Sequence, residues 1–322
     1  MKKKIILVGG DPNSINSEII FKSWKKLNNK IKRETVLLAN YELMKSQAKK
    51  LKLSVKMEKF NNFQKIKDSF NIKILDIPLK FKNPFSVPHK ESRNYITQSF
   101  NLAHKLALSK YVKGIINCSV DKSLIRKKKN IGITELLASK CKIKDNSQVM
   151  LLYNKKLSVV PITTHIKIKE ISKKINKTLI AKKINVLSKN YKRIFKFKPK
   201  MAVLGLNPHN AEYSRKSEEK LNIIPAIKLL RKQGIKIQGP LVADTVFIEN
   251  YKKFNVIIGM YHDQVITPFK TLFKFDAVNI TLGLKYFRIS PDHGPAKDLI
   301  KKNKANYSSL MKCFEIIYNF SK

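Results

Sequence analysis

Three of the six histidines follow short apolar segments that predict β-strands. His165 comes after the run SVVPITT, His209 after MAVLGLNP and His262 after VIIGMY. In open parallel α/β sheets, ligands bind beyond the carboxyl ends of the strands. Imidazole nitrogens are common ligands of zinc and other divalent metals. The pattern therefore predicts that the three rings converge on one divalent cation, and it leaves structural or surface histidines as the alternative.

Two aspartates lie close to these histidines or to the segments that precede them. Asp263 is adjacent to His262, and Asp244 lies in the segment GPLVADTVF. A carboxylate near a metal orients a ligand or relays a proton, so both aspartates are candidate catalytic residues. A turn or a helix cap is the simpler interpretation of either aspartate alone.

A cationic and polar trio follows His262 in the sequence. Lys270 and Arg288 supply charge and donors for a phosphate or carboxylate group, and Arg can grip two oxygens at once. Asn279 sits in the strand-like run AVNITLGL, where an inward polar side chain needs a partner. Together the three predict a site for a phosphate or carboxylate group, whereas a single lysine of this chain would be interpreted as a surface residue.

The composition predicts a folded protein without a membrane span. The chain has 322 residues, is 43% hydrophobic, and contains no apolar run near the roughly 20 residues that a span requires. The opening MKKKIILVGG reaches Gly9 and Gly10 too early for a signal peptide, so we expect a cytoplasmic location. The three cysteines are far apart and form no C-x-x-C pair, which favours buried free thiols.

The formal net charge of +45 raises the alternative of a nucleic-acid-binding protein, or of a degenerate enzyme kept for binding. Lysines outnumber arginines by 60 to 7 and are spread along the chain. Specific base contacts are made mainly by arginine, so we expect no specific nucleic-acid partner. Cations clustered with exposed aromatic residues on one face would favour the alternative.

The elements that must position these residues alternate between apolar runs and amphipathic segments, which predicts an α/β protein with a largely parallel sheet. The expected strands are 5–8, 35–38, 114–117, 149–153, 158–163, 202–206, 256–260 and 277–281, and the expected helices lie near 17–27, 95–111, 167–187, 217–233 and 307–318. The Lys-rich segment 122–129 is predicted to be a loop. The loop GGDPNSINSEI follows the first strand and suits an anion or substrate, although it is not a G-x-G-x-x-G fingerprint.

Several strings together resemble one family, the 4-hydroxythreonine-4-phosphate dehydrogenases of pyridoxal phosphate biosynthesis. The strongest is YHDQVITPFKTLFKFDAVNITLGLKYFRISPDHGPAKD. GGDPNSINSE, PITTH, GLNPHNAE and GPLVADTVF match further blocks in the family's order, over nearly the whole chain.

The resemblance implies a three-layer α/β/α fold of two lobes, similar to the isocitrate and isopropylmalate dehydrogenases. Residues 1–322 would form a single catalytic unit, with a cleft between the lobes and lobe boundaries that the sequence does not mark. The resemblance also implies a homodimer whose active site lies near the interface between subunits.

The family's site residues map onto this chain one by one. His165, His209 and His262 match its metal ligands, and the matching substrate contacts are Thr134, Lys270, Asn279 and Arg288. The family uses NAD and a divalent cation. The residues here do not choose among Zn, Mg, Mn and Co, nor between NAD and NADP. The implied reaction is oxidation and decarboxylation of 4-phosphohydroxy-L-threonine to 3-amino-2-oxopropyl phosphate.

Some positions depart from the family pattern. Ile133 stands in GITE, where the family has a substrate-contacting histidine, and Ile cannot donate a hydrogen bond. Ser14 and Asn16 replace glycines of the opening loop, and YSRKS replaces a Gly-rich run after His209. The alternative function is therefore a related metal-dependent dehydrogenase of another phosphorylated hydroxy-acid, such as threonate or erythronate phosphate.

Overall fold

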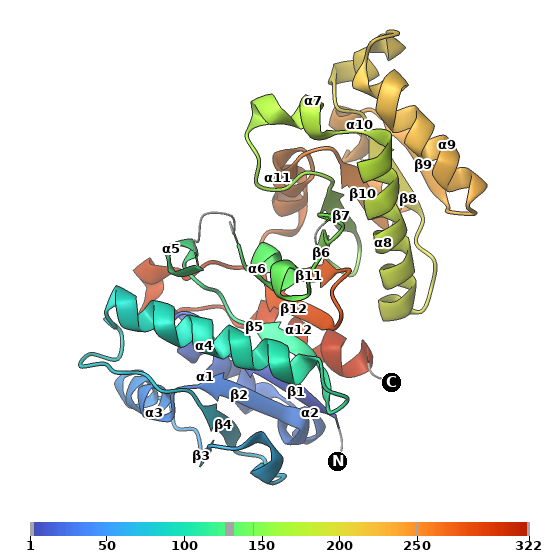
Figure 1. Cartoon of the computed structure of the whole chain (residues 1–322). Coiled ribbons are helices and arrows are strands. Elements are labelled where there is room, and N and C mark those ends of the chain that lie inside the picture. The colour runs from blue at the N-terminus through green and yellow to red at the C-terminus, as the bar shows by residue number, and fades with distance from the viewer. Residues whose placement is uncertain (1–2, 126–131, 144, 249, 321–322) are drawn as a thin grey trace. The chain divides into compact units, whose positions relative to one another are not determined.

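The chain divides into two compact units. The computed structural model describes residues 3–125, 132–143, 145–248 and 250–320 (Figure 1). Unit 1 comprises Met1–Cys141 and Lys285–Lys322, and unit 2 comprises Lys142–Leu284. Unit 1 is thus built from two separate stretches of sequence, and unit 2 is inserted between them.

The described residues of unit 1 form six parallel strands in the order β3-β4-β2-β1-β5-β12. Their bounds are β1 Lys4–Val8, β2 Thr35–Ala39, β3 Met57–Phe60, β4 Ile72–Asp76, β5 Val112–Asn117 and β12 Phe287–Pro291. Every residue of β1 and β2 is buried, as expected for strands that are covered on both faces. Strand β2 pairs with one edge of β1, and β5 pairs with the other edge. The strand order therefore reverses between β1 and β5, and the carboxyl ends of these two strands form the topological switch point of the sheet.

Two of the helices of unit 1 begin after an asparagine that caps them. The described helices of this unit are α1 Asn16–Lys26, α2 Asn29–Glu34, α3 Tyr41–Lys50, α4 His89–Ala107, α5 Lys122–Ile125, α6 Ile133–Lys140 and α12 Ser308–Phe320, with short 3₁₀ turns at Phe63–Lys65 and Lys297–Leu299. Asn28 and Asn40 cap α2 and α3 by accepting bonds from backbone N–H groups. Helix α4 buries Ile96, Phe100 and Ala103 at helical spacing and packs on β1 and β5.

Unit 2 has a mixed set of six strands in the order β11-β6-β7-β10-β8-β9. Their bounds are β6 Val149–Tyr153, β7 Ser158–Pro161, β8 Met201–Leu204, β9 Ile237–Leu241, β10 Val256–Gly259 and β11 Val278–Leu282. The four strands β7, β10, β8 and β9 are parallel, whereas β6 runs antiparallel to both β7 and β11. The neighbouring segments that follow β7, β10 and β8 therefore leave the sheet at the same edge.

The described helices of unit 2 are α7 Ile171–Lys174, α8 Lys177–Phe195, α9 Ile224–Lys232, α10 Ala243–Val246 and α11 His262–Phe273, with 3₁₀ turns at Ile168–Glu170, Pro208–Tyr213 and Asn250–Lys253 and a π-helical turn at Glu219–Ile223. Three of these helices, α8, α9 and α11, pack on strands of this sheet. Val265 and Phe269 of α11 lie in one buried cluster with Val159, Leu204 and Ile257 of the strands. Burial of this apolar face holds α11 against the strands. His262 is the first residue of α11, just beyond the carboxyl end of β10.

The structure confirms the α/β class, the largely parallel sheets and each of the eight expected strands. The helix expected at 167–187 is interrupted, because Asn176 caps a new helix by accepting a bond from Leu179 N. The loop predicted at 122–129 is wrong for Lys122–Ile125, which form α5, and residues 126–129 lie outside the described part. All three cysteines are free and buried, as predicted. Among the described residues, no helix has both the length and the hydropathy of a bilayer span.

Candidate functional site

The three predicted ligand histidines all follow strands of unit 2. His165 comes four residues after β7, His209 five residues after β8, and His262 three residues after β10. Since these strands are adjacent and parallel, their carboxyl ends meet at one edge of the sheet. We call the segments after these three strands, residues 162–165, 205–213 and 260–263, the histidine edge.

Two of the histidines lie side by side. The ring centroids of His165 and His262 are 5.6 Å apart, and the two rings are tilted by 36°. The Nδ1 atom of His262 lies 2.6 Å from Oδ1 of Asp263. A carboxylate on one ring nitrogen fixes the orientation of an imidazole and leaves the other nitrogen for a ligand. The pair is thus suited to bind a cation or to hold a proton.

His209 lies on a turn with an unusual backbone. Residues 209–213 all have positive φ angles, with values of 48°, 58°, 50°, 46° and 56°. Residues other than glycine pay roughly 1–2 kcal/mol each in this left-handed region. The imidazole of His209 is exposed on this turn.

Among the residues that the structure describes, no group of three His, Cys, Asp or Glu side chains is arranged to hold a metal ion. The structure therefore brings His165 and His262 together and does not bring His209 into a three-ligand cluster with them. The donor chemistry fits a divalent metal, and two of the three expected donors are already neighbours.

The base of the His209 turn is anchored by a buried carboxylate. Oε1 of Glu219 accepts hydrogen bonds from the backbone N–H groups of Leu206 (2.8 Å) and Asn207 (2.9 Å). Burial works to raise the pKa of Glu219, but the hydrogen bonds from Asn207 and Leu206 outweigh it and hold the pKa below its ordinary value. Glu219 is therefore ionised at neutral pH and holds the root of the turn, where Asn210 is buried while His209, Glu212 and Tyr213 are exposed.

The other predicted residues of unit 2 have different environments. Lys270 lies near the end of α11, with Nζ 5.8 Å from the centroid of the Phe275 ring. Asn279 lies in β11, and its buried Oδ1 accepts no hydrogen bond from the described residues. A buried acceptor without a donor is unfavourable, so this oxygen suits a donor from a ligand. Asp244 is exposed in α10.

Two predicted substrate contacts belong to unit 1. Arg288 is 3% exposed in β12, and its Nε donates a 2.7 Å bond to Oδ1 of Asn117. Burial lowers the pKa of Arg288 to about 10, so the guanidinium remains charged at neutral pH. Thr134 is the second residue of α6, directly after Ile133. The predicted substrate contacts are thus divided between the two units.

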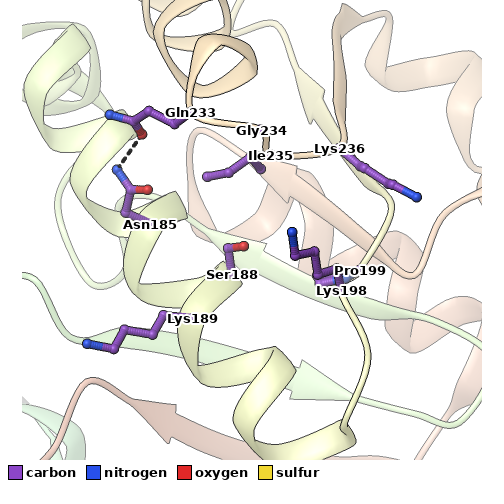
Figure 2. Close-up of a pocket in the computed structure, with 9 residues that line it drawn as sticks. All are labelled: Asn185, Ser188, Lys189, Lys198, Pro199, Gln233, Gly234, Ile235 and Lys236. Atoms are coloured by element: carbon purple, nitrogen blue, oxygen red, sulfur yellow. Dashed lines mark hydrogen bonds between the residues drawn. The ribbon is translucent and has the colours of Figure 1, made fainter.

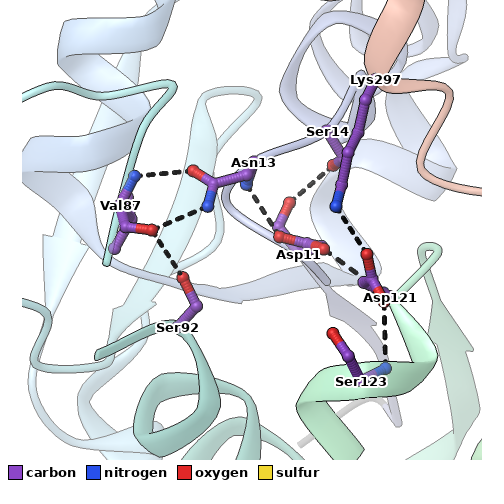
Figure 3. A network of polar contacts seen from close by, with 8 residues as sticks. All are labelled: Asp11, Asn13, Ser14, Val87, Ser92, Asp121, Ser123 and Lys297. Atoms are coloured by element: carbon purple, nitrogen blue, oxygen red, sulfur yellow. Dashed lines mark hydrogen bonds and ion pairs between the residues drawn. The ribbon is translucent and has the colours of Figure 1, made fainter. Parts of the chain in front are cut away.

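A polar network at the switch point of unit 1 was not anticipated from the sequence (Figure 3). Asp11, 3% exposed, accepts bonds from the backbone N–H groups of Asn13 (2.8 Å) and Asp121 (3.3 Å). Asp121 in turn forms a 2.6 Å ion pair with Lys297. Burial raises the pKa of Asp11, whereas the hydrogen bond from Lys297 lowers the pKa of Asp121 to about 2. The only sequence signal for this network was an aspartate directly after the first strand.

A pocket of about 200 Å³ lies elsewhere in unit 2 (Figure 2). Lys198 and Pro199, which precede β8, line it together with Ile235 and Lys236, which precede β9. These positions are at the amino ends of the strands, opposite to the histidine edge. None of the predicted site residues lines this pocket.

Comparisons with known proteins agree over almost the full length. Residues 30–317 match the family model of the pyridoxal phosphate biosynthetic protein PdxA. A 4-hydroxythreonine-4-phosphate dehydrogenase from Aquifex aeolicus (strain VF5) is 36% identical over 321 residues, which cover 98% of each chain. The crystal structure of a 4-hydroxythreonine-4-phosphate dehydrogenase from Klebsiella pneumoniae matches with a TM-score of 0.83 at 28% identity, covering 100% of both chains.

A more distant likeness concerns the fold alone. An isocitrate dehydrogenase from Methylococcus capsulatus matches with a TM-score of 0.51 at 10% identity, covering 98% of this chain and 84% of that one. The fold class predicted from the sequence is therefore confirmed. From the family match and the near-complete relatives, we conclude that the chain belongs to the family of the pyridoxal phosphate biosynthetic protein PdxA.

Proposed function

We propose that this protein is a dehydrogenase of 4-hydroxythreonine 4-phosphate, acting in pyridoxal phosphate biosynthesis. Membership of the family supports the reaction class. The observation that carries the proposal within the structure is the adjacency of His165 and His262 at the carboxyl edge of unit 2, with Asp263 on His262.

We propose that His165, His209 and His262 hold a divalent metal ion. Imidazole donors favour zinc or another transition metal over magnesium. When bound, such an ion acts as a Lewis acid that stabilises negative charge on a substrate oxygen.

The chain's own cations would bind the phosphate group of the substrate. Lys270 supplies a mobile ammonium, and Arg288 supplies a guanidinium that Asn117 already orients. Thr134 offers a hydroxyl group, and the buried Oδ1 of Asn279 offers an acceptor for a substrate hydroxyl or amine. These residues would fix the substrate so that its reacting carbon is held in one place.

Oxidation of the substrate hydroxyl releases one proton and one hydride. We propose that a carboxylate, Asp263 or Asp244, takes the proton directly or through water. No amino-acid side chain accepts a hydride, so a nicotinamide cofactor, NAD, is proposed as the acceptor. The resulting β-keto acid loses carbon dioxide, and a proton replaces it to give 3-amino-2-oxopropyl phosphate.

We also propose a cytoplasmic homodimer. Eleven large apolar side chains are exposed among the described residues, and eight of these belong to unit 2, including Ile168, Ile248 and Phe275. Single exposed apolar side chains are common on monomeric proteins, so the dimer proposal rests on what the family resemblance implies. Light scattering of the purified protein is expected to give twice the mass of one chain, 37.2 kDa, and a monomer mass would contradict the dimer.

The proposed function is tested by His165→Ala and His262→Ala, with His89→Ala as the matched control. His89 is exposed at the start of α4 in unit 1. We expect the first two variants to lose bound metal, measured by atomic spectrometry, and to lose about 100-fold or more in NADH production. The control keeps both. Undiminished turnover by a variant that holds no metal would overturn the assignment.

Ile133 supports a second candidate substrate. It is the first residue of α6, beside Thr134, and it offers no hydrogen-bond donor to a substrate. The candidates are threonate phosphate and erythronate phosphate. They differ from 4-phosphohydroxy-L-threonine in the groups that a hydrogen-bond donor at position 133 would contact. Parallel measurement of kcat/KM on these compounds and on 4-phosphohydroxy-L-threonine decides between them, and a higher value for the sugar acids would replace the proposed substrate.

A further inference from the structure

Gln264 joins the ends of two strands of the histidine edge. Its Oε1 accepts a 2.7 Å hydrogen bond from the backbone N–H of Met260, and its Nε2 donates a 2.7 Å bond to the carbonyl oxygen of Gly205. Met260 follows β10 and precedes His262, whereas Gly205 follows β8 and precedes His209. One side-chain amide therefore connects the two segments that carry these histidines.

This amide continues the sheet beyond its last backbone pair. The register between β8 and β10 ends at Val203 and Ile258. Gly205 and Met260 lie two residues further on, where the strands no longer pair directly. The primary amide of Gln264 carries an NH₂ group that donates and a C=O group that accepts, and it makes one bond of each kind in the gap between the strands.

The third strand is attached at the same residue. The carbonyl oxygen of Met260 accepts bonds from the backbone N–H of Thr163 (3.1 Å) and from its Oγ1 (2.6 Å). Thr163 follows β7 and lies two residues before His165. Met260 is thus held by Thr163 through its C=O group and by Gln264 through its N–H group, so the ends of β7, β10 and β8 form one connected unit.

A helix-capping role accounts for only half of this arrangement. Gln264 is the third residue of α11, where a Glu or Gln side chain commonly accepts a bond from a backbone N–H at the helix start. Such a role needs an acceptor only, and a glutamate would serve. The bond from Nε2 to Gly205 lies outside the helix and requires an amide.

Gly259 lies against the side chain of Gln264, and Gly205 lies against the turn that carries His209. A Cβ atom at Gly259 would lie 2.9 Å from Oε1 of Gln264 and 2.6 Å from Cγ1 of Val265. A Cβ atom at Gly205 would collide with Oδ1 of Asn210. Close approach of the backbone to these side chains therefore excludes larger residues at both positions.

We propose that Gln264 is a positioning residue, which together with Thr163 fixes the strand ends so that His165, His209 and His262 can share one metal ion. The inference rests on the proposed function. Gln264 touches neither the substrate nor the ion in this role, since it acts through the backbone of Met260 and Gly205. Small displacements of a ligand's support are sufficient to weaken metal binding.

The test compares Gln264→Glu with Gln264→Met in the full-length protein. The glutamate keeps the acceptor for Met260 N–H and loses the donor for Gly205, whereas methionine keeps the length and loses both groups. Gln47→Met is the matched control, because Gln47 of unit 1 is 2% exposed and its Nε2 donates to the carbonyl oxygens of Pro12 and Pro84. Affinity for Zn²⁺ and Co²⁺ is measured by calorimetry, and Tm by circular dichroism.

We expect both Gln264 variants to bind metal about 10-fold or more weakly than the wild type, and the visible spectrum of bound Co²⁺ to change. Gln47→Met is expected to lower Tm without changing metal affinity. If Gln264→Glu binds as tightly as the wild type, or if Gln47→Met weakens binding equally, the positioning role is overturned. If the wild type itself binds no metal, the metal assignment under the proposed function fails, and this inference fails with it.

A second pair of variants serves if the Gln264 variants do not fold. Thr163→Val removes only the bond from Oγ1 to Met260 and keeps the shape, whereas Thr163→Ser restores a hydroxyl group. We expect about threefold weaker metal binding for valine and recovery for serine. Equal affinity for the two variants would contradict the proposal.

Discussion

The carboxyl edges of the two units are built in opposite ways. At the switch point of unit 1, Asp11, Asp121 and Lys297 bond to one another and to the loop backbone (Figure 3). At the histidine edge of unit 2, Gln264 and Thr163 tie the strand ends, but the segment beyond Gly205 enters a left-handed turn with His209 exposed. The first edge is held together by its own side chains. At the second edge, hydrogen bonds join the strand ends, but the turn that follows carries an exposed histidine. This difference supports the proposal that a ligand completes the second edge.

The largest expected effect is on amide exchange. A metal ion at about 100 times Kd stabilises the form that binds it by about 2.7 kcal/mol, which slows local exchange about 100-fold. We expect this protection in peptides covering 162–165, 205–213 and 260–263, with little change at 9–14 and 118–121. Hydrogen exchange read by mass spectrometry measures both sets. Equal protection of the two sets would break the contrast between the edges.

A methyl group at Gly205 is expected to have the next largest effect. The added Cβ would collide with Asn210 and lie 3.1 Å from Oε1 of Glu219, so Gly205→Ala should lower the free energy of unfolding by about 2–3 kcal/mol. Gly294→Ala is the control, because no atom lies within 4 Å of a Cβ at that position. Denaturant titration followed by circular dichroism gives both values. A neutral Gly205→Ala would show that the root of the His209 turn is not tightly packed.

Arg288→Lys should separate substrate binding from metal binding. Lysine keeps the charge but loses the bond from Nε to Asn117, so we expect a loss of about 1–2 kcal/mol in stability together with a raised KM. Metal content should stay at the wild-type level, because Arg288 belongs to unit 1. Steady-state kinetics and metal analysis of the same preparation check this. A loss of metal without a change in KM would contradict the assigned role.

The smallest effect concerns the ion pair of Asp121 and Lys297. The folded pKa of Asp121, about 2, lies below its ordinary value of 3.8, so the pair stabilises unit 1 above pH 3.8 and loses this contribution as pH falls to about 2. Lys297→Met should lower stability at neutral pH by less than about 1 kcal/mol, since Lys297 is mostly exposed, and should flatten the stability curve between pH 3.8 and 2.

Trp24 provides the readout for this change. It is the single tryptophan, 6% exposed in unit 1, so its fluorescence follows the unfolding of that unit. Lys25→Met is the control, because Lys25 is exposed on α1 and has no ion pair among the described residues. The same acid dependence in wild type and Lys297→Met would show that the pair contributes nothing.

Apolar runs made eight of the described strands predictable, and topology made the place of the histidines predictable. Strands β4 and β12 were missed because a charged residue, Lys73 in IKILD and Arg288 in FRISP, interrupts each apolar run. The short polar strand β3 was missed because MEKF is partly exposed throughout. Strand β9 was missed because Gly239 and Pro240 normally mark turns. Helix α11 was missed because it contains Pro268 and opens with polar residues.

Side-chain geometry was harder to predict than position. The sequence predicted that His165, His209 and His262 follow strands. It did not predict the left-handed turn that carries His209, because residues 209–213 contain no glycine. The role of Gln264 could not be predicted, because its partner Gly205 is 59 residues away and such a hydrogen bond leaves no local sequence pattern. The hydrogen bond from the backbone N–H of Asp121 to Asp11 likewise joins residues that are 110 positions apart.

The discontinuity of unit 1 sets an order for its synthesis on the ribosome. Strand β12, which pairs with β5, and helix α12, which packs on both, follow unit 2 in the sequence. Unit 2 therefore leaves the ribosome before unit 1 can be completed, and β5 keeps an unpaired edge until β12 has been synthesised. A nascent chain stalled before Phe287 would expose the edge of β5, so early termination would favour aggregation. Unit 2 is continuous in sequence and is therefore the unit suited to expression on its own.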